Sequence, residues 1–173
     1  SLVRQTYTNW ELVLVDASDA DKRLEHRLPK AVPGTIVYEP IENGGIALNT
    51  TRGFALAHGE YITLLDHDDV LYPNALFEVV QTIQNTGADF VYSDEIVLSA
   101  DLKELGGYHF KPDFAPDYLR GVNFITHLAV FSRPLLDAAG AYESKEFDGA
   151  QDHDLILRLT EKAQRIEHIK KVL

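Results

Sequence analysis

The chain has no cysteine, no long hydrophobic run and a shortage of basic residues. Without cysteine it can form neither a disulfide framework nor a thiolate metal site, which fits a reducing compartment. No apolar stretch reaches about eighteen residues, and no charged-then-apolar segment marks a signal peptide. The 27 Asp and Glu residues outnumber the 16 Lys and Arg residues, for a net charge of −11. Such a charge argues against general binding of nucleic acid or of an anionic membrane.

Length and composition are those of an ordinary folded domain. At 173 residues, with 45% hydrophobic and 25% charged residues, the chain can bury a sizeable core. No internal repeat, linker or low-complexity tract is visible, so we expect the chain to form a single domain over residues 1–173. The chain opens in mid-pattern at Ser1 and ends within a predicted strand at 166–173. A fragment of a longer protein is the simplest interpretation.

Strand and helix patterns alternate along the chain. Strands are predicted at 11–16, 34–39, 61–65, 88–94, 127–133 and 166–173, and helices at 21–28, 46–57, 73–87, 134–140 and 152–163. The stretch 106–123 is predicted to be an aromatic loop. In the helix at 73–87, apolar residues repeat at helical spacing and Gly87 ends the pattern. This succession predicts an α/β fold with a mostly parallel central sheet and helices on both faces.

Three predicted strands end in aspartate, at Asp16, Asp66 and Asp94. The carboxyl ends of parallel strands share one edge of a sheet, so these carboxylates are expected to converge on one cleft. The densest cluster is LLDHDD at 64–69, where neighbouring like charges need a cation or hydrogen-bond donors. Hard oxygen ligands suit Mg²⁺ or Mn²⁺. The alternatives are a solvated acidic turn for the cluster and helix caps or turns for the single aspartates.

Four stretches in a fixed order resemble the family 2 glycosyltransferases of the GT-A fold, and together they span almost the whole chain. They are QTYTNWELVLVD, NGG at 43–45, GEYITLLDHDD and QDHDLILRL at 151–159. Three more resemble a bacterial subgroup described as cell-wall, O-antigen or exopolysaccharide enzymes, often rhamnosyltransferase-like: YSDE, HFKPDFAPDYL and HLAVFSRPLLDAAGAY. The family's first apolar strand has no counterpart here. The resemblance therefore implies a GT-A nucleotide-diphospho-sugar transferase fold that lacks the first strand.

The resemblance implies nucleotide-binding roles at two strand ends and one loop. Asp16 matches the aspartate that hydrogen-bonds the nucleotide base. Asn43, Gly44 and Gly45 match the loop beside the nucleotide, where glycine permits close backbone approach. Asp66 matches the first aspartate of the DxD motif, near the ribose. These residues form the expected nucleotide-sugar site.

The resemblance also implies a metal ligand and a catalytic base. Asp68 matches the aspartate that holds a divalent metal, Mn²⁺ or Mg²⁺, on the diphosphate, while Asp69 is expected to cap the next helix or to support Asp68. Asp152 matches the family's catalytic base, in the first turn of a helix whose apolar side faces the core. The alternative for Asp152 and Asp154 is a pair of favourable charges at a helix N-terminus.

Five further residues are candidates for the sugar or acceptor pocket. Asp94 and Glu95 are expected to line it, with Asp94 on the nucleotide-sugar side. His109, Lys111 and His127 are candidates for contacts with acceptor or phosphate, although a lone histidine is more often structural.

The resemblance implies an inverting glycosyltransferase of the hexosyltransferase class (EC 2.4). It would move a sugar from a UDP- or dTDP-sugar to a saccharide or lipid-linked acceptor in surface polysaccharide synthesis. We expect a cytoplasmic location, or a peripheral one at the inner face of the cell membrane, and a homo-oligomer that compensates for the absent strand. Two alternatives stay open: a non-catalytic nucleotide-sugar-binding module, and a metal-dependent nucleotidyltransferase or phosphohydrolase. The chain shows no glycine- and lysine-rich phosphate loop of the kind a nucleotidyltransferase would need.

Overall fold

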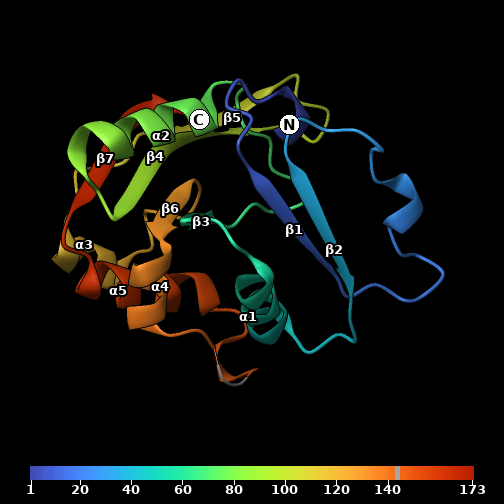
Figure 1. The fold of residues 1–173 in the computed structure, drawn as a ribbon. Coiled ribbons are helices and arrows are strands. Elements are labelled where there is room, and N and C mark those ends of the chain that lie inside the picture. Colours follow the sequence, from blue (N-terminus) through green and yellow to red (C-terminus); the bar gives the residue numbers. More distant parts are fainter. Residues whose placement is uncertain (143–144) are drawn as a thin grey trace.

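The computed structural model describes residues 1–142 and 145–173, and its strands form two separate sheets (Figure 1). The smaller sheet pairs β1 (Glu11–Asp16) with β2 (Thr35–Pro40) in parallel, from Glu11 opposite Thr35 to Asp16 opposite Pro40. A short helical turn, η1 (Leu2–Arg4), precedes β1, and another, η2 (Glu25–Arg27), lies in the connection to β2. The observed β1 has the bounds expected from its apolar run.

The larger sheet has five strands and mixed pairing. They are β3 (Tyr61–Thr63), β4 (Phe90–Leu98), β5 (Leu105–His109), β6 (Ala129–Ser132) and β7 (Ile166–Val172). β6 lies between β3 and β4 and is antiparallel to both, β5 is antiparallel to β4, and β7 is parallel to β4. The sheet is therefore less parallel than expected. The reason is that β5 folds back on β4 as an antiparallel strand and β6 then enters the sheet in the reverse direction after a long connection.

The two sheets share no strand pairing within the residues that the structure describes. β1 and β2 lie on one side of the molecule and the five-stranded sheet on the other, with α1 (Ile46–Leu56) below the division between them (Figure 1). This division leaves β1 attached to the rest of the domain mainly through α1, against which it packs.

Helices cover both faces of the larger sheet, as expected. Alternate residues of β4 and β6 point to opposite faces, so Phe90, Tyr92 and Phe131 join one core cluster while Val91 and Val130 join the other. The first cluster packs against α1, α3 (Pro116–Gly121), α4 (Arg133–Ala139) and α5 (Gln151–Lys162). The second packs against α2 (Ala75–Thr86). Burying each large side chain contributes roughly 1.5–3 kcal/mol.

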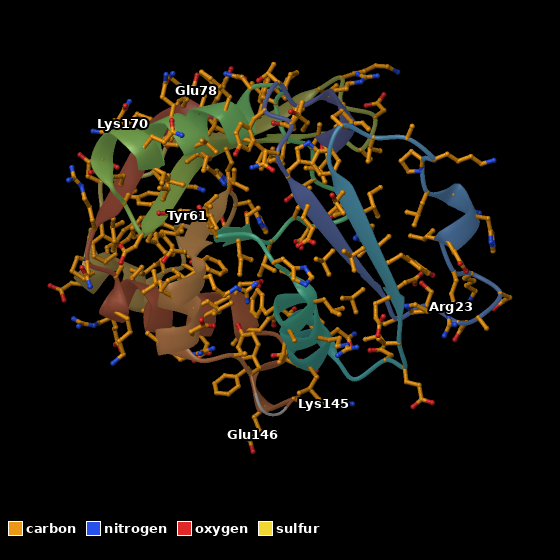
Figure 2. All side chains as sticks on the ribbon, viewed as in Figure 1. Arg23, Tyr61, Glu78, Lys145, Glu146 and Lys170 are labelled. Carbon is orange, nitrogen blue, oxygen red and sulfur yellow. The ribbon has the colours of Figure 1, made fainter. Side chains whose placement is uncertain are left out.

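Hydrogen bonds tie β3, the strand that leads to LLDHDD, into this core. The Tyr61 hydroxyl donates to the backbone oxygen of Ala88 at 2.9 Å, and Tyr61 lies toward the interior of the molecule (Figure 2). The Thr63 hydroxyl donates to the backbone oxygen of Ala129 at 2.8 Å. These two hydrogen bonds therefore fix the position of the strand from which the acidic segment LLDHDD continues.

Three expected elements differ from the structure. The stretch 106–123 is not only loop: it contains most of β5 and all of α3. β5 has the sequence LGGYH, which is a poor strand former alone and becomes a strand because it pairs with β4. The predicted helix at 21–28 is reduced to η2, and the predicted strand at 61–65 ends at Thr63. No helix among the described residues is long and apolar enough to cross a membrane.

Candidate active site

A small pocket lies where β3 ends, next to the segment that leads into β6 and the first turns of α5. Its lining is mostly apolar, with three ionisable side chains among Leu64, Asp66, Thr126, His127, Ala129, Phe131, Asp152, Leu155 and Ile156. The ionisable ones are Asp66, His127 and Asp152. The fold thus brings Asp66, the first aspartate of LLDHDD, and Asp152, the predicted base, to one pocket although they lie far apart in the sequence.

Asp66, Asp69 and His127 form a group with the geometry to hold a metal ion. One ligand atom from each lies within 4.8 Å of the others. His127 Nε2 is 3.5 Å from an Asp66 carboxylate oxygen, and His127 Nδ1 is 3.8 Å from an Asp69 carboxylate oxygen. Two carboxylates and one imidazole fit a divalent ion, since carboxylates suit Mg²⁺ and Mn²⁺ and imidazole is a ligand for transition metals.

Asp68, the metal ligand expected from the resemblance, lies outside this group. Its side chain is 77% exposed, and its nearest ionic neighbour is His67, whose Nδ1 lies 3.9 Å from the carboxylate. Asp69 does not cap the next helix, because α2 begins only at Ala75. Instead the backbone N–H of Asp69 donates to the Asp66 carbonyl at 3.1 Å, which closes a turn and brings the two carboxylates near each other.

Asp152 lies in the first turn of α5, as expected. The helix forms because Leu155, Ile156 and Leu159 recur on one face and are buried. Burial against the pocket wall raises the pKa of Asp152, and the negative charge of Asp66 raises it further; His127 and a hydrogen bond from Gln151 partly oppose this. A carboxylate with a raised pKa is a better proton acceptor than an ordinary aspartate.

Contacts from Tyr142 and from α3 hold the start of α5 in place. The Tyr142 hydroxyl donates to the Gln151 carbonyl, and Tyr142 is itself joined to α1 through the Thr51 hydroxyl. His153 Nε2 lies 2.7 Å from the Leu119 carbonyl in α3. Asp152 therefore sits on a rigid platform made by α1, α3 and α5.

Comparison with known proteins identifies the family. A model of the family described as glycosyl transferase family 2 matches residues 1–136. The chain belongs to glycosyl transferase family 2. This confirms the predicted family and the glycosyltransferase class, EC 2.4.

Relatives and solved structures agree with that assignment. The chain is 40% identical to the protein y4gI of Sinorhizobium fredii over 183 aligned residues and 35% identical to the O-antigen biosynthesis protein RfbC of Myxococcus xanthus over 177. All of the chain is covered, but only 20% and 14% of these relatives. The crystal structure of S. aureus TarS 1-349 in complex with UDP-GlcNAc superimposes with a TM-score of 0.77 at 18% identity, covering 99% of this chain and 51% of that one. That likeness confirms the α/β GT-A fold.

In this family 2 domain, the Asp16 carboxylate is hydrogen-bonded to neighbouring groups of the domain itself. It is 4% exposed, and its carboxylate accepts hydrogen bonds from the N–H groups of Ser18 and Leu24 and from the Tyr38 hydroxyl, at 3.0, 2.8 and 2.8 Å. The Leu24 and Ser18 hydrogen bonds strongly lower the pKa of Asp16. The side chain thus organises the loop after β1, and its contact with a nucleotide base stays a prediction.

The loop of Asn43, Gly44 and Gly45 leads into α1 and is also engaged within the domain. The Asn43 side-chain oxygen accepts from the N–H of Gly45 at 3.0 Å, and the N–H of Gly44 donates to the Asn49 side chain at 3.0 Å. Asp148, beyond η3 (Lys145–Phe147), accepts from the N–H of Ala47 at 2.8 Å. Figure 2 labels Lys145 and Glu146 of the short segment that packs against α1 here. The nucleotide role of the loop stays a prediction.

Asp94 lies at the centre of a buried hydrogen-bond network and does not line the pocket. One carboxylate oxygen accepts from the N–H of Lys111 at 2.9 Å and lies 2.9 Å from His168 Nε2. The His168 ring stacks on Tyr92 with centroids 4.6 Å apart, and its Nδ1 lies 3.3 Å from Asp113. The proposed contact of Asp94 with a nucleotide-sugar is not tested by this arrangement.

Sequence reasoning missed two residues of these networks, His168 and Asp148. Each is isolated in the sequence and acquires its partners only through long-range packing, so no motif pointed to it. His127 is one of the two candidate histidines, and its nearness to both Asp66 and Asp69 distinguishes it from His109, which pairs with Glu95 at 2.9 Å.

Proposed function

We propose that this domain catalyses inverting transfer of a sugar from a nucleoside-diphosphate-sugar to a hydroxyl group of a saccharide or lipid-linked acceptor. The observation that carries the proposal is the shared pocket of Asp66, His127 and Asp152. A proton acceptor, Asp152, thus lies next to a group of side chains suited to binding a divalent ion. An enzyme that must deprotonate a hydroxyl and release a diphosphate needs both.

Asp152 is the proposed base. As the acceptor oxygen forms its bond to the anomeric carbon, its proton passes to the Asp152 carboxylate, and the bond from the anomeric carbon to the phosphate oxygen breaks. The nucleoside diphosphate leaves with the electron pair. The raised pKa of Asp152 favours this proton transfer.

Asp66, Asp69 and His127 are the proposed ligands of the divalent metal that members of the GT-A family usually use. Bound there, Mn²⁺ or Mg²⁺ would stabilise negative charge on the departing diphosphate. Asp68, exposed beside this group, is the competing ligand from the sequence pattern. Mn²⁺ titration of Asp69→Asn and Asp68→Asn separates the two assignments, because the true ligand is the one whose loss weakens binding.

The biological setting is proposed from the relatives. RfbC is named for O-antigen biosynthesis, and the colanic acid glycosyl transferase WcaA of Escherichia coli is 28% identical over 190 residues. TarS has been crystallised with UDP and with UDP-GlcNAc. We therefore infer a role in surface polysaccharide synthesis with a UDP-sugar as the first donor to test. The chain spans only 20% and 14% of the lengths of y4gI and RfbC, so what those whole proteins do is not transferred to it directly.

The test is donor turnover with an acceptor. UDP- and dTDP-sugars are incubated with Mn²⁺ and a panel of saccharide acceptors, and the released nucleoside diphosphate is measured. We expect release that depends on acceptor, and we expect Asp152→Asn to slow it by about 10²–10⁴-fold while UDP binding, measured by calorimetry, stays unchanged. Asp154→Asn is the matched control, because it removes the same charge from the same turn but at a residue paired with Arg158.

The outcomes separate the alternatives. Undiminished transfer by Asp152→Asn would overturn the assignment of the base. Binding of UDP-sugars without turnover under any acceptor would support the binding-module alternative, and pyrophosphate-dependent formation of UTP from a UDP-sugar would support a nucleotidyltransferase.

A further inference from the structure

Lys111 is a buried lysine close to the pocket, and its ammonium group is fully occupied. Its side chain is 2% exposed. Nζ donates to Glu95 Oε2 at 3.2 Å, to the Ile125 carbonyl at 2.8 Å and to the His127 carbonyl. An ammonium group has three N–H donors, so the three acceptors satisfy it completely. Burial lowers the pKa of Lys111, and the charge of Glu95 opposes that shift.

Glu95 holds the same segment by complementary contacts. Its carboxylate accepts from the Thr126 hydroxyl at 3.2 and 3.3 Å and from the N–H of His127 at 3.3 Å. Burial would raise the pKa of Glu95, but hydrogen bonds from His109, Lys111 and Thr126 and the charge of Lys111 outweigh it and lower the pKa. The carboxylate is therefore held ionised, as an acceptor for these donors.

Together the two side chains hold residues 125–127 through both kinds of backbone group. Lys111 binds the carbonyls on either side of Thr126, while Glu95 binds the Thr126 hydroxyl and the N–H that follows it. These contacts fix the backbone of His127, whose ring lies beside Asp66 and Asp69. A buried ion pair destabilises the fold unless its hydrogen bonds are complete. Because the Lys111–Glu95 pair lies directly behind the metal-binding group, its position indicates a role beyond packing.

We propose that Lys111 and Glu95 are positioning residues that hold His127 in place to bind the divalent ion together with Asp66 and Asp69. The inference rests on the proposed function. Neither residue contacts the reacting groups, and both act through the segment 125–127. Outer contacts of this kind typically change metal affinity by 10–100-fold when removed.

The test measures Mn²⁺ binding by the full chain without any nucleotide, from the electron paramagnetic resonance signal of free Mn²⁺. The main variant is Lys111→Met with Glu95→Gln, which removes both charges together and so leaves no uncompensated buried ion. We expect its Mn²⁺ dissociation constant to rise about tenfold or more, with unchanged circular dichroism. Lys170→Met is the matched control, because Lys170 is 67% exposed and pairs with Asp113 away from the pocket.

A second measurement separates positioning from general loosening. In a His127→Ala background the double substitution should cause no further loss of Mn²⁺ affinity, because the residue through which it acts is gone. In turnover assays the double variant should need more Mn²⁺ for half-maximal rate, and saturating Mn²⁺ should restore most of kcat. Thr126→Val removes only the hydroxyl that donates to the Glu95 carboxylate, so it is a milder variant that should weaken Mn²⁺ binding if the double variant fails to fold.

The possible results are distinguishable. If the wild type binds Mn²⁺ and His127→Ala weakens it, but the double variant and Thr126→Val bind as the wild type does, the positioning role is wrong and the proposed metal site stands. If His127→Ala also leaves Mn²⁺ binding unchanged, the proposed metal site and this inference are both wrong.

Discussion

Gly45 offers a sharp test of how the loop before α1 is held. Its φ of 95° and ψ of 163° lie in a region that is almost exclusive to glycine. A Cβ atom placed on Gly45 would lie 2.4 Å from an Asp148 carboxylate oxygen, well inside van der Waals contact. The other oxygen of that carboxylate accepts the hydrogen bond from Ala47. Gly45→Ala must therefore strain the backbone and displace Asp148.

The expected cost has two parts. The backbone strain contributes roughly 1–3 kcal/mol. Loss of the Asp148–Ala47 hydrogen bond, at a partly buried helix N-terminus, adds about 0.5–1 kcal/mol. Gly87→Ala is the matched control, because Gly87 also has a positive φ of 70° but nothing within 4 Å of the added Cβ. It should cost only the backbone part, about 1–2 kcal/mol.

A double-mutant cycle isolates the contact. Urea unfolding, followed by circular dichroism, gives the free energy of unfolding for Gly45→Ala, Asp148→Ala and the pair. Because Asp148→Ala removes both the clash and the hydrogen bond, the pair should cost less than the sum of the single variants by about 0.5–1 kcal/mol. Additivity within about 0.3 kcal/mol, together with equal costs for Gly45→Ala and Gly87→Ala, would refute the reasoning.

Three further predictions concern the pocket and its supports. Asp152→Asn should raise Tm at neutral pH without metal, because the raised pKa of Asp152 means that its ionised carboxylate destabilises the folded state. This gain in Tm should vanish as the pH falls to about 4 or below, where Asp152 is protonated in the unfolded chain as well. Asp16→Asn should lower Tm at neutral pH, and the loss should shrink on acidification below about pH 4, since a lowered pKa stabilises the fold only while the group is ionised. Phe131→Ala, which empties a position 1% exposed beneath the pocket and removes a ring contact with Phe54, should cost about 3–5 kcal/mol in urea unfolding, and a loss below 1.5 kcal/mol would contradict the packing.

Local patterns predicted the elements whose stability is mostly local. β1 and α5 were predictable because their apolar residues repeat at strand and helix spacing. The GT-A fold and the proposed role of Asp152 as the base came from the family resemblance, which records packing that periodicity does not contain. The α/β class followed from the alternation of strand and helix patterns alone.

What could not be predicted depends on long-range partners. β6 pairs with β3 and β4 in the antiparallel sense, and nothing in the sequence AVFS specifies that direction. The grouping of His127 with Asp66 and Asp69 depends on the segment 125–127, whose path is set by buried contacts from β4 and from the residues after β5. A buried lysine carries no sequence signature, since lysine is usually exposed.

Because the strands form two separate sheets, two spectroscopic signals report on different parts of the chain. Its single tryptophan, Trp10, directly precedes β1, and its carbonyl accepts the hydrogen bond from Thr35 in β2. Indole fluorescence therefore observes the two-stranded sheet, while far-ultraviolet circular dichroism is dominated by the helices and the five-stranded sheet. Where the two signals change together, the halves unfold as one cooperative unit, and where they separate, the half that carries Asp16 has its own stability.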